Sequence, residues 1–402
     1  MLDTGGMRDG RASELRIEGH IAPGFEPVRE AFARNFAVRG EVGAAVCLVR
    51  DGEPVVDLWG GLADPTTGRA WRRDDLALVF STTKGVTAAC IARLCERGVL
   101  DVEAPVARYW PEFAANGKAG VRISDVLSHR AGLPEVEGRF TLEQACAGDP
   151  LCEALAKQAP QWPPGTAHGY HARTYGWILG EVVRRATGER FGRVLARELA
   201  APLGLERDLF VGLPPEHDWR VARILPAPEP TDPKERELRA RFMGPESMLG
   251  RVLSGPSNLF EYGEMWNTRL LRGAEMPSSN GIATARALAR LYAALVGPVD
   301  DVRLLAPETV ERFRAEQVVG PDRVLLVPSR FGLGFALPPM LSTECPDACF
   351  GHPGAGGSLA FADPEARIGF GYAMNQMHFG LTGDARAASL VRAVYTSLGR
   401  PR

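Results

Sequence analysis

Lysine is scarce in this sequence. Of the 47 basic residues in a chain of 402, only Lys84, Lys118, Lys157 and Lys234 are lysine, and the remaining 43 are arginine. The net charge of −2 provides no field that would attract nucleic acid or an anionic membrane surface, so we expect neither as a partner. A lysine kept by such a chain is informative, because a buried lysine can lose its proton and an arginine cannot.

Long apolar runs and cysteine frameworks are also missing. No apolar stretch reaches the length of a membrane span, and the first sixteen residues contain no apolar core of a secretory signal. The seven cysteines are an odd number, and Cys47, Cys90 and Cys95 fall in apolar segments typical of a protein core. Zinc-finger spacings, G-x-G-x-x-G and P-loop motifs are absent. We therefore expect a cytoplasmic protein with no metal and no cofactor.

Hydrophobic patterns at both ends of the chain predict strands. Apolar runs at 44–49 and 55–59 flank Asp51-Gly52, a pair that tolerates the positive φ angles of a two-residue hairpin turn. The other elements expected near the ends are strands at 331–336, 358–361 and 368–374 and amphipathic helices near 25–36 and 387–398.

The middle of the chain, about 101–296, reads as helices and loops, with helical runs such as 182–186 and 285–295. This order predicts an α/β (α+β) fold. Residues 20–100 together with 297–402 are expected to form one lobe around an antiparallel sheet. Residues 101–296 are expected to form an inserted, mostly helical lobe, with the active site in the cleft between the two.

A Ser-x-x-Lys motif opens the apolar helical run at 86–94. In a helix, residues three apart share one face, so Lys84 is placed to take a proton from Ser81. Ser81 is also expected at the start of the helix, where backbone N–H groups have no partner. Nucleophile, base and half of an oxyanion hole are thus predicted from four residues.

Two other segments offer the groups that a serine–lysine pair still needs. Residues 164–170 (PGTAHGY) end in Tyr170, which could move a proton to the leaving atom. Residues 351–357 (GHPGAGG) are rich in glycine, which lets a backbone approach a ligand closely, and they precede a predicted strand.

With these motifs in this order, the sequence resembles the serine β-lactamase and penicillin-binding-protein superfamily, and within it the class C-like carboxylesterases called family VIII. The resemblance covers roughly residues 40–398. It includes residues 127–133 (LSHRAGL) and His352-x-Gly354, which stands where the lactamases carry Lys-Thr-Gly.

The resemblance implies a lactamase-like fold and a division of roles. Ser81 would be the nucleophile, and Lys84 and Tyr170 would shuttle its proton. The backbone N–H groups of Ser81 and Ala355 would hold the oxyanion.

Two departures from the lactamase pattern bear on the substrate. The asparagine expected two residues after the tyrosine is Ala172, and the lysine of the third motif is His352. In the family these side chains help to hold the amide and the carboxylate of a β-lactam. Because both side chains are lost and no export signal is seen, we do not expect a role in antibiotic defence.

Four residues are candidates for contact with substrate: His352, Gly354, Trp177 and His171. Each also has a structural interpretation, because buried histidines are usually hydrogen-bonded and scattered aromatic residues usually belong to the core. Tyr175, inside the following helix, is a rival to Tyr170 but is expected to pack.

We therefore predict a serine hydrolase that cleaves small carboxylic esters, with a preference for short acyl groups. The alternatives are an acyltransferase of the same fold, a weak hydrolase of β-lactams or D-amino-acid amides, and a non-catalytic ligand-binding relic. The sequence does not indicate an oligomeric state.

Overall fold

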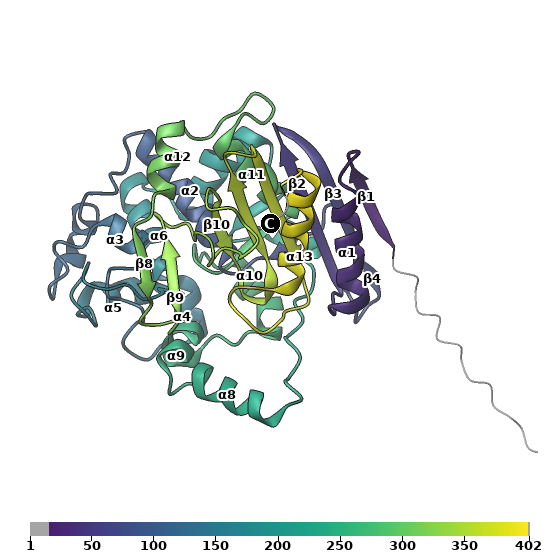
Figure 1. Ribbon diagram of the computed structural model, residues 1–402. Helices are drawn as coiled ribbons and strands as arrows, with labels where there is room; N and C mark the ends of the chain where they lie inside the picture. The colour runs from purple at the N-terminus through teal and green to yellow at the C-terminus, as the bar shows by residue number, and fades with distance from the viewer. Residues whose placement is uncertain (1–15, 401–402) are drawn as a thin grey trace, which may run out of the picture.

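Strands from the two ends of the chain meet in one antiparallel sheet. The structure, a computed structural model, describes residues 16–400 (Figure 1). The strand order is β1-β3-β2-β12-β11-β10, and β4 pairs with β3 at the side. These strands are β1 (Ile17–Ile21), β2 (Gly43–Arg50), β3 (Glu53–Asp64), β4 (Arg69–Ala70), β10 (Phe350–Pro353), β11 (Leu359–Asp363) and β12 (Ile368–Met374). The predicted mixed fold with an antiparallel sheet is confirmed.

Local turn chemistry explains two of the hairpins. Asp51 and Gly52 have φ of 53° and 85°, as the tight turn between β2 and β3 requires. The Asp363 carboxylate accepts the backbone N–H groups of Glu365 and Ala366 at 2.9 and 3.0 Å, which shapes the turn from β11 to β12.

The strand predicted at 331–336 is wrong. Strand β9 (Pro328–Phe331) ends where that run begins, and it pairs with β8 (Val318–Pro321) outside the main sheet. The chain then turns, with Gly334 at φ 82° and the Gly332 N–H donating to the carbonyl of Phe335. The two glycines allow a bend that the apolar pattern alone does not reveal.

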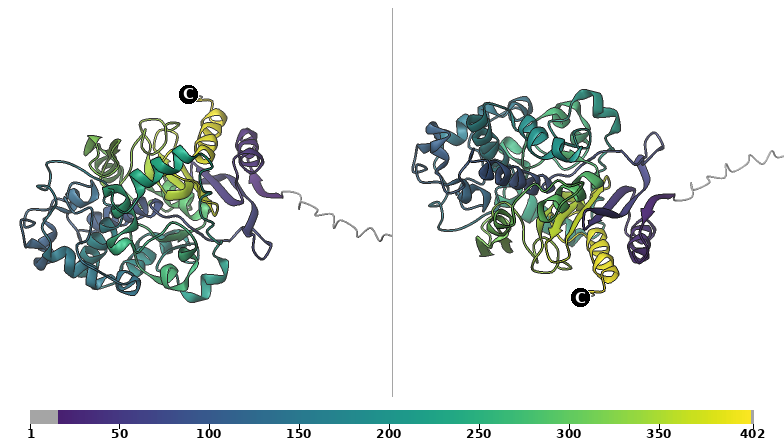
Figure 2. Two further views of the ribbon diagram at one scale, coloured as in Figure 1. Left: turned by 90° about the horizontal axis from the view of Figure 1, so that it is seen from below. Right: turned by 90° about the horizontal axis from the view of Figure 1, so that it is seen from above.

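Helices cover both faces of the sheet (Figure 2). Helices α1 (Glu26–Val38) and α13 (Ala385–Ser397) pack side by side on one face, and α11 (Ala285–Val296) packs on the other. Contact with α11 is close, because a Cβ atom at Gly369 of β12 would lie 2.2 Å from the carbonyl oxygen of Ala289. The predicted boundary at 296 placed α11 in the helical lobe, but the helix packs on the sheet.

The remaining helices and short strands form the second body of the molecule. Helix α2 (Thr82–Glu96) is almost wholly buried and contacts both this body and the β10 edge of the sheet. No helix within 16–400 is both long and apolar enough to cross a membrane. The other elements are α3 (Ile123–Leu127), α4 (Leu142–Ala147), α5 (Asp149–Lys157), α6 (Thr174–Thr187), α7 (Phe191–Leu195), α8 (Pro233–Met243), α9 (Met248–Ser254), α10 (Arg269–Gly273), α12 (Pro307–Arg314), β5 (Ala77–Leu78), β6 (Leu209–Val211) and β7 (Gly281–Ala283).

Candidate active site

Ser81 lies at the N-terminus of α2, directly after a strained residue. Phe80 has φ of 42°, a left-handed conformation that is uncommon for a bulky side chain. Ser81 itself has helical angles, and its side chain does not cap the helix. Its hydroxyl is therefore left free for another partner. Ser81 is only partly buried, whereas Lys84 one turn later is fully buried.

Lys84 is held by three oxygen atoms. Its Nζ lies 2.8 Å from the carbonyl oxygen of Ala172, 2.9 Å from that of Ser278 and 3.2 Å from the Ser81 Oγ. Burial, together with the positive charge of Arg173, holds the pKa of Lys84 well below its usual range. The pair therefore has the geometry of a nucleophile and a base that is able to accept a proton.

Tyr170 completes the group. Lys84 Nζ lies 4.8 Å from the centroid of its ring, and the Ser81 side chain lies beside the phenol. Its backbone N–H donates to Asp322 at 3.1 Å, which fixes the loop before α6. Burial raises the pKa of Tyr170, so the phenol is protonated at neutral pH. The rival, Tyr175, instead donates its hydroxyl to the backbone carbonyl of Lys84 at 3.1 Å.

The glycine-rich turn at 354–357 lies against the start of α2. The Ser358 hydroxyl donates to the carbonyl of Val79 at 2.8 Å and lies 3.1 Å from Thr82 Oγ1. Gly354 is required there, because a Cβ atom would lie 2.3 Å from the Val79 carbonyl oxygen. Within the described residues, neither the Ser81 N–H nor the Ala355 N–H has an acceptor. Two unpaired donors thus lie on segments that are bonded to each other.

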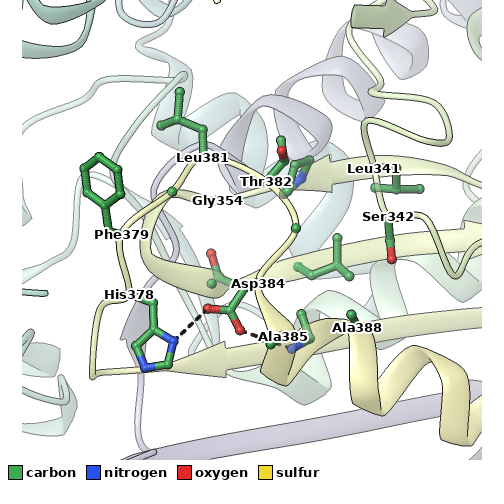
Figure 3. Close-up of a pocket in the computed structure, with 17 residues that line it drawn as sticks. Leu341, Ser342, Gly354, His378, Phe379, Leu381, Thr382, Asp384, Ala385 and Ala388 are labelled. Atoms are coloured by element: carbon green, nitrogen blue, oxygen red, sulfur yellow. Dashed lines mark hydrogen bonds and ion pairs between the residues drawn. The ribbon is translucent and has the colours of Figure 1, made fainter. Parts of the chain in front are cut away.

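Three charged side chains support this turn from behind. Arg386 donates to the carbonyl of Gly356 at 2.6 Å and pairs with Glu41 at 3.0 Å and with Asp384 at 2.9 Å. Figure 3 shows the adjoining cavity of about 130 Å³, where His378 lies 3.4 Å from Asp384. The turn is therefore anchored by a buried ion network on its far side.

The histidines of the site are neutral. His171 is fully buried, and its two ring nitrogens bond the backbone N–H of Leu133 at 2.9 Å and the carbonyl of Gly169 at 2.6 Å. Burial lowers the pKa of His171 to about 4 and that of His352 to about 3. His352 Nδ1 donates to the carbonyl of Pro353 at 2.7 Å, and its Nε2 has no partner among the described residues. His352 therefore cannot replace the cation of a lysine.

Two of the predicted substrate contacts have structural roles in the described residues. The His171 ring is fully buried and fully hydrogen-bonded, so it orders the loop around Tyr170. The Trp177 indole is buried in α6 and lines a separate pocket with Cys152 and Glu181. Substrate contact by either side chain stays a prediction. Gly354 remains at the site, with a packing role.

Several residues at the site gave no usable signal in the sequence. The Ser278 carbonyl accepts from Lys84 Nζ, and the Asp322 carboxylate accepts from the Tyr170 N–H, and each acceptor lies far along the chain from that donor. Tyr262 and Met243 line two adjoining pockets, of about 500 and 60 Å³, and Ala355 lines the smaller one. No group of three or more His, Cys, Asp or Glu side chains within 16–400 is arranged to hold a metal ion.

Comparison with known proteins places this fold and site in a family. The Beta-lactamase family model matches residues 29–393. The chain is 38% identical to Esterase/beta-lactamase LipL of Mycobacterium tuberculosis (strain ATCC 25618 / H37Rv), over 94% of this chain and 88% of LipL.

Two solved structures are similar over nearly their whole length. The crystal structure of a family VIII carboxylesterase has a TM-score of 0.84 at 39% identity and covers 95% of this chain and 100% of that one. EstA from Arthrobacter nitroguajacolicus Rue61a has a TM-score of 0.84 at 35% identity and covers 94% of this chain and 98% of its own. The resemblance inferred from the motifs is confirmed, and the chain belongs to the beta-lactamase family.

Proposed function

We propose that this protein is a serine hydrolase that cleaves carboxylic esters through an acyl-Ser81 intermediate. The observation that carries the proposal is the environment of Lys84 Nζ. Two of its three neighbours, the carbonyl oxygens of Ala172 and Ser278, can only accept hydrogen bonds. A neutral amine has two N–H groups for these carbonyls, and its lone pair then faces the Ser81 hydroxyl at 3.2 Å.

This arrangement sets the direction of the first proton transfer. As Ser81 Oγ attacks the ester carbonyl, its proton passes to Lys84. The negative oxygen that develops is held by the Ser81 and Ala355 N–H groups, and one such donor is worth about 3–4 kcal/mol. Tyr170, whose phenol lies beside Ser81, then passes its proton to the leaving alcohol and takes the proton that Lys84 holds. Water releases the acyl group by the reverse sequence of transfers.

The size of the adjoining pocket supports a short acyl group. The pocket of about 60 Å³ beside Ala355 is lined by apolar side chains, among them Met243, Met377 and Leu381. Burying each CH₂ of a substrate there contributes about 0.8 kcal/mol until the space is filled. A small ester therefore fits, and a long acyl chain has to extend into the larger cleft beyond Met243.

The names of the relatives support the reaction class. One solved relative is described as a family VIII carboxylesterase, and the curated relative LipL is named as an esterase and a β-lactamase. For a β-lactam, this site offers neither a side-chain amide at Ala172 nor a cation at His352. Weak β-lactam hydrolysis is thus the second candidate, favoured by the name of LipL alone.

The cysteines bear on the proposed cytoplasmic location. All seven are free, and they include Cys345 and Cys349, four positions apart in one loop. Free thiols in such a pair are typical of a reducing compartment.

One labelling experiment tests the proposal. The wild-type protein should react with a fluorophosphonate probe at Ser81, as mapped by mass spectrometry, and should hydrolyse p-nitrophenyl acetate or butyrate far faster than nitrocefin. Ser81→Ala should lose both labelling and turnover, whereas Ser397→Ala, which changes a hydroxyl on α13 that has no partner within 16–400, should keep both.

Each contrary result has its own meaning. Label on another serine would move the nucleophile. Nitrocefin turnover equal to or above ester turnover would make the protein a lactamase. A higher yield of acyl transfer to added alcohol than of hydrolysis would make it an acyltransferase, and a folded protein that takes no label would be a relic.

A further inference from the structure

Arg173 is a buried cation enclosed by aromatic rings. It immediately precedes α6 and is 3% exposed. Its guanidinium carbon lies 4.5 Å from the ring centroid of Phe260, 5.1 Å from that of Trp266 and 5.5 Å from that of Tyr262. The faces of such rings attract a cation, so they hold the guanidinium in place without cancelling its charge.

No carboxylate in the described part of the chain neutralises this cation. Its Nε and Nη2 donate to the backbone carbonyl of Leu253 at 3.1 and 2.9 Å, and within 16–400 no Asp or Glu forms an ion pair with it. Buried charges are usually paired, as Arg386 is with Glu41 and Asp384. Burial lowers the pKa of Arg173, but a guanidinium remains charged at neutral pH.

The backbone of Arg173 is connected directly to the residues that hold Lys84. The preceding carbonyl, that of Ala172, accepts a hydrogen bond from Lys84 Nζ. The Arg173 carbonyl accepts one from the hydroxyl of Ser278, whose own carbonyl also accepts from Lys84. These bonds fix the backbone of Arg173 beside the base, and the Leu253 carbonyl and the three rings hold its guanidinium.

The phenols and imidazoles that lie around Lys84 are uncharged. Tyr170 and Tyr175 lie against Lys84, and burial raises the pKa of both phenols. Tyr262 faces Arg173. The histidines that feel the charge of Lys84 are His129, His171 and His352, and burial lowers the pKa of each. The acid in this region is Asp322, whose carboxylate accepts the Tyr170 N–H and contributes to raising the pKa of both Tyr170 and His171.

We propose that Arg173 is a positioning residue whose unpaired charge keeps Lys84 neutral before the reaction and drives the proton onward after it. The inference rests on the proposed function. Burial and a fixed cation nearby both disfavour the protonated form, so Lys84 enters the reaction as a free amine. When Lys84 takes the Ser81 proton, the same repulsion favours its transfer through Tyr170 to the leaving oxygen. No carboxylate is needed in the relay.

The test is the pH dependence of kcat/KM for p-nitrophenyl acetate in three variants. Arg173→Gln removes the charge and retains an N–H group for the Leu253 carbonyl, and Arg173→Met removes both. In each, the acid limb of the profile should move to higher pH by about one unit, because Lys84 then holds its proton more tightly. Arg173→Lys keeps a charge and should leave the limb near its wild-type position.

A control and a wild-type measurement complete the design. Arg272→Met removes another buried guanidinium, paired with Asp218, and should not move the limb. An unmoved limb in folded Arg173→Gln or Arg173→Met would overturn the inference. So would a wild-type rate of fluorophosphonate labelling that is still rising above about pH 9, even if no variant folds. Label found at a residue other than Ser81 would instead overturn the proposed function.

Discussion

Replacing Gly354 with alanine should disable the oxyanion hole while leaving the nucleophile in place. The new Cβ would lie 2.1 Å from Ser358 Oγ and 2.3 Å from the carbonyl oxygen of Val79. The serine side chain can rotate away, but the carbonyl belongs to the backbone. Because carbon and oxygen rarely approach within about 3.3 Å, the turn has to retreat by about 1 Å.

That displacement also moves the N–H group of Ala355, because Ala355 is the next residue in the turn. A misplacement of about 1 Å can cost about 10²-fold, and loss of one oxyanion donor costs about 10²–10³-fold in kcat. We therefore expect Gly354→Ala to lose at least about 10²-fold in kcat for p-nitrophenyl acetate. Gly120→Ala is the matched control, because a Cβ there meets nothing within 4 Å.

The assay has to separate a displaced turn from an unfolded protein. Thermal unfolding and fluorophosphonate titration would give the folded and reactive fractions of each preparation, and kcat is then normalised to active sites. Near-wild-type kcat for Gly354→Ala, with the control also active, would refute the argument that this contact positions Ala355.

Three other predictions follow from the same geometry. Lys84→Arg should lose about 10²–10⁴-fold in kcat, since arginine keeps its proton; retention of more than about a tenth of kcat would contradict a proton-transfer role. Tyr170→Phe should cost about 10²-fold or more in kcat, whereas Tyr175→Phe should cost only about 1 kcal/mol in thermal stability, and the reverse pattern would exchange their roles. Arg386→Met should cost about 3–5 kcal/mol in urea unfolding at neutral pH. Burial raises the pKa of Glu41 to about 7, so below that pH its carboxyl is protonated and has less need of the Arg386 cation. The loss should therefore shrink near about pH 5, and an equal loss at both values would refute the reasoning.

The sequence by itself determined what depends on near neighbours in the chain. Ser81 and Lys84 share a helix face because an α-helix returns to that face within three to four residues, whatever packs around it. The hairpin at Asp51-Gly52 follows from the φ angles that those residues tolerate. Order and spacing of three motifs were sufficient to identify the family, which the match to residues 29–393 confirms.

The strand predicted at 331–336 shows where local patterns fail. An apolar run reports burial, and a buried turn with two glycines shows the same run as a buried strand. Helix α11 was likewise predicted correctly as a helix and assigned to the wrong layer. The sequence of α11 does not indicate that the helix packs on the sheet, where Gly369 has no side chain and allows its close approach.

Only the tertiary structure decided which distant groups surround the reacting atoms. The carbonyls that orient Lys84 come from residues 88 and 194 positions away, and a backbone carbonyl has no signature in a sequence. Arg173 stands three residues after Tyr170. Its proposed role depends on the absence of an Asp or Glu partner within 16–400, and no sequence motif reveals that absence. Trp177 and His171 follow Tyr170 closely in the sequence, but the structure gives them packing and hydrogen-bonding roles. Local rules fix the spacing of side chains along one helix, whereas burial, charge isolation and access arise when separate segments pack together.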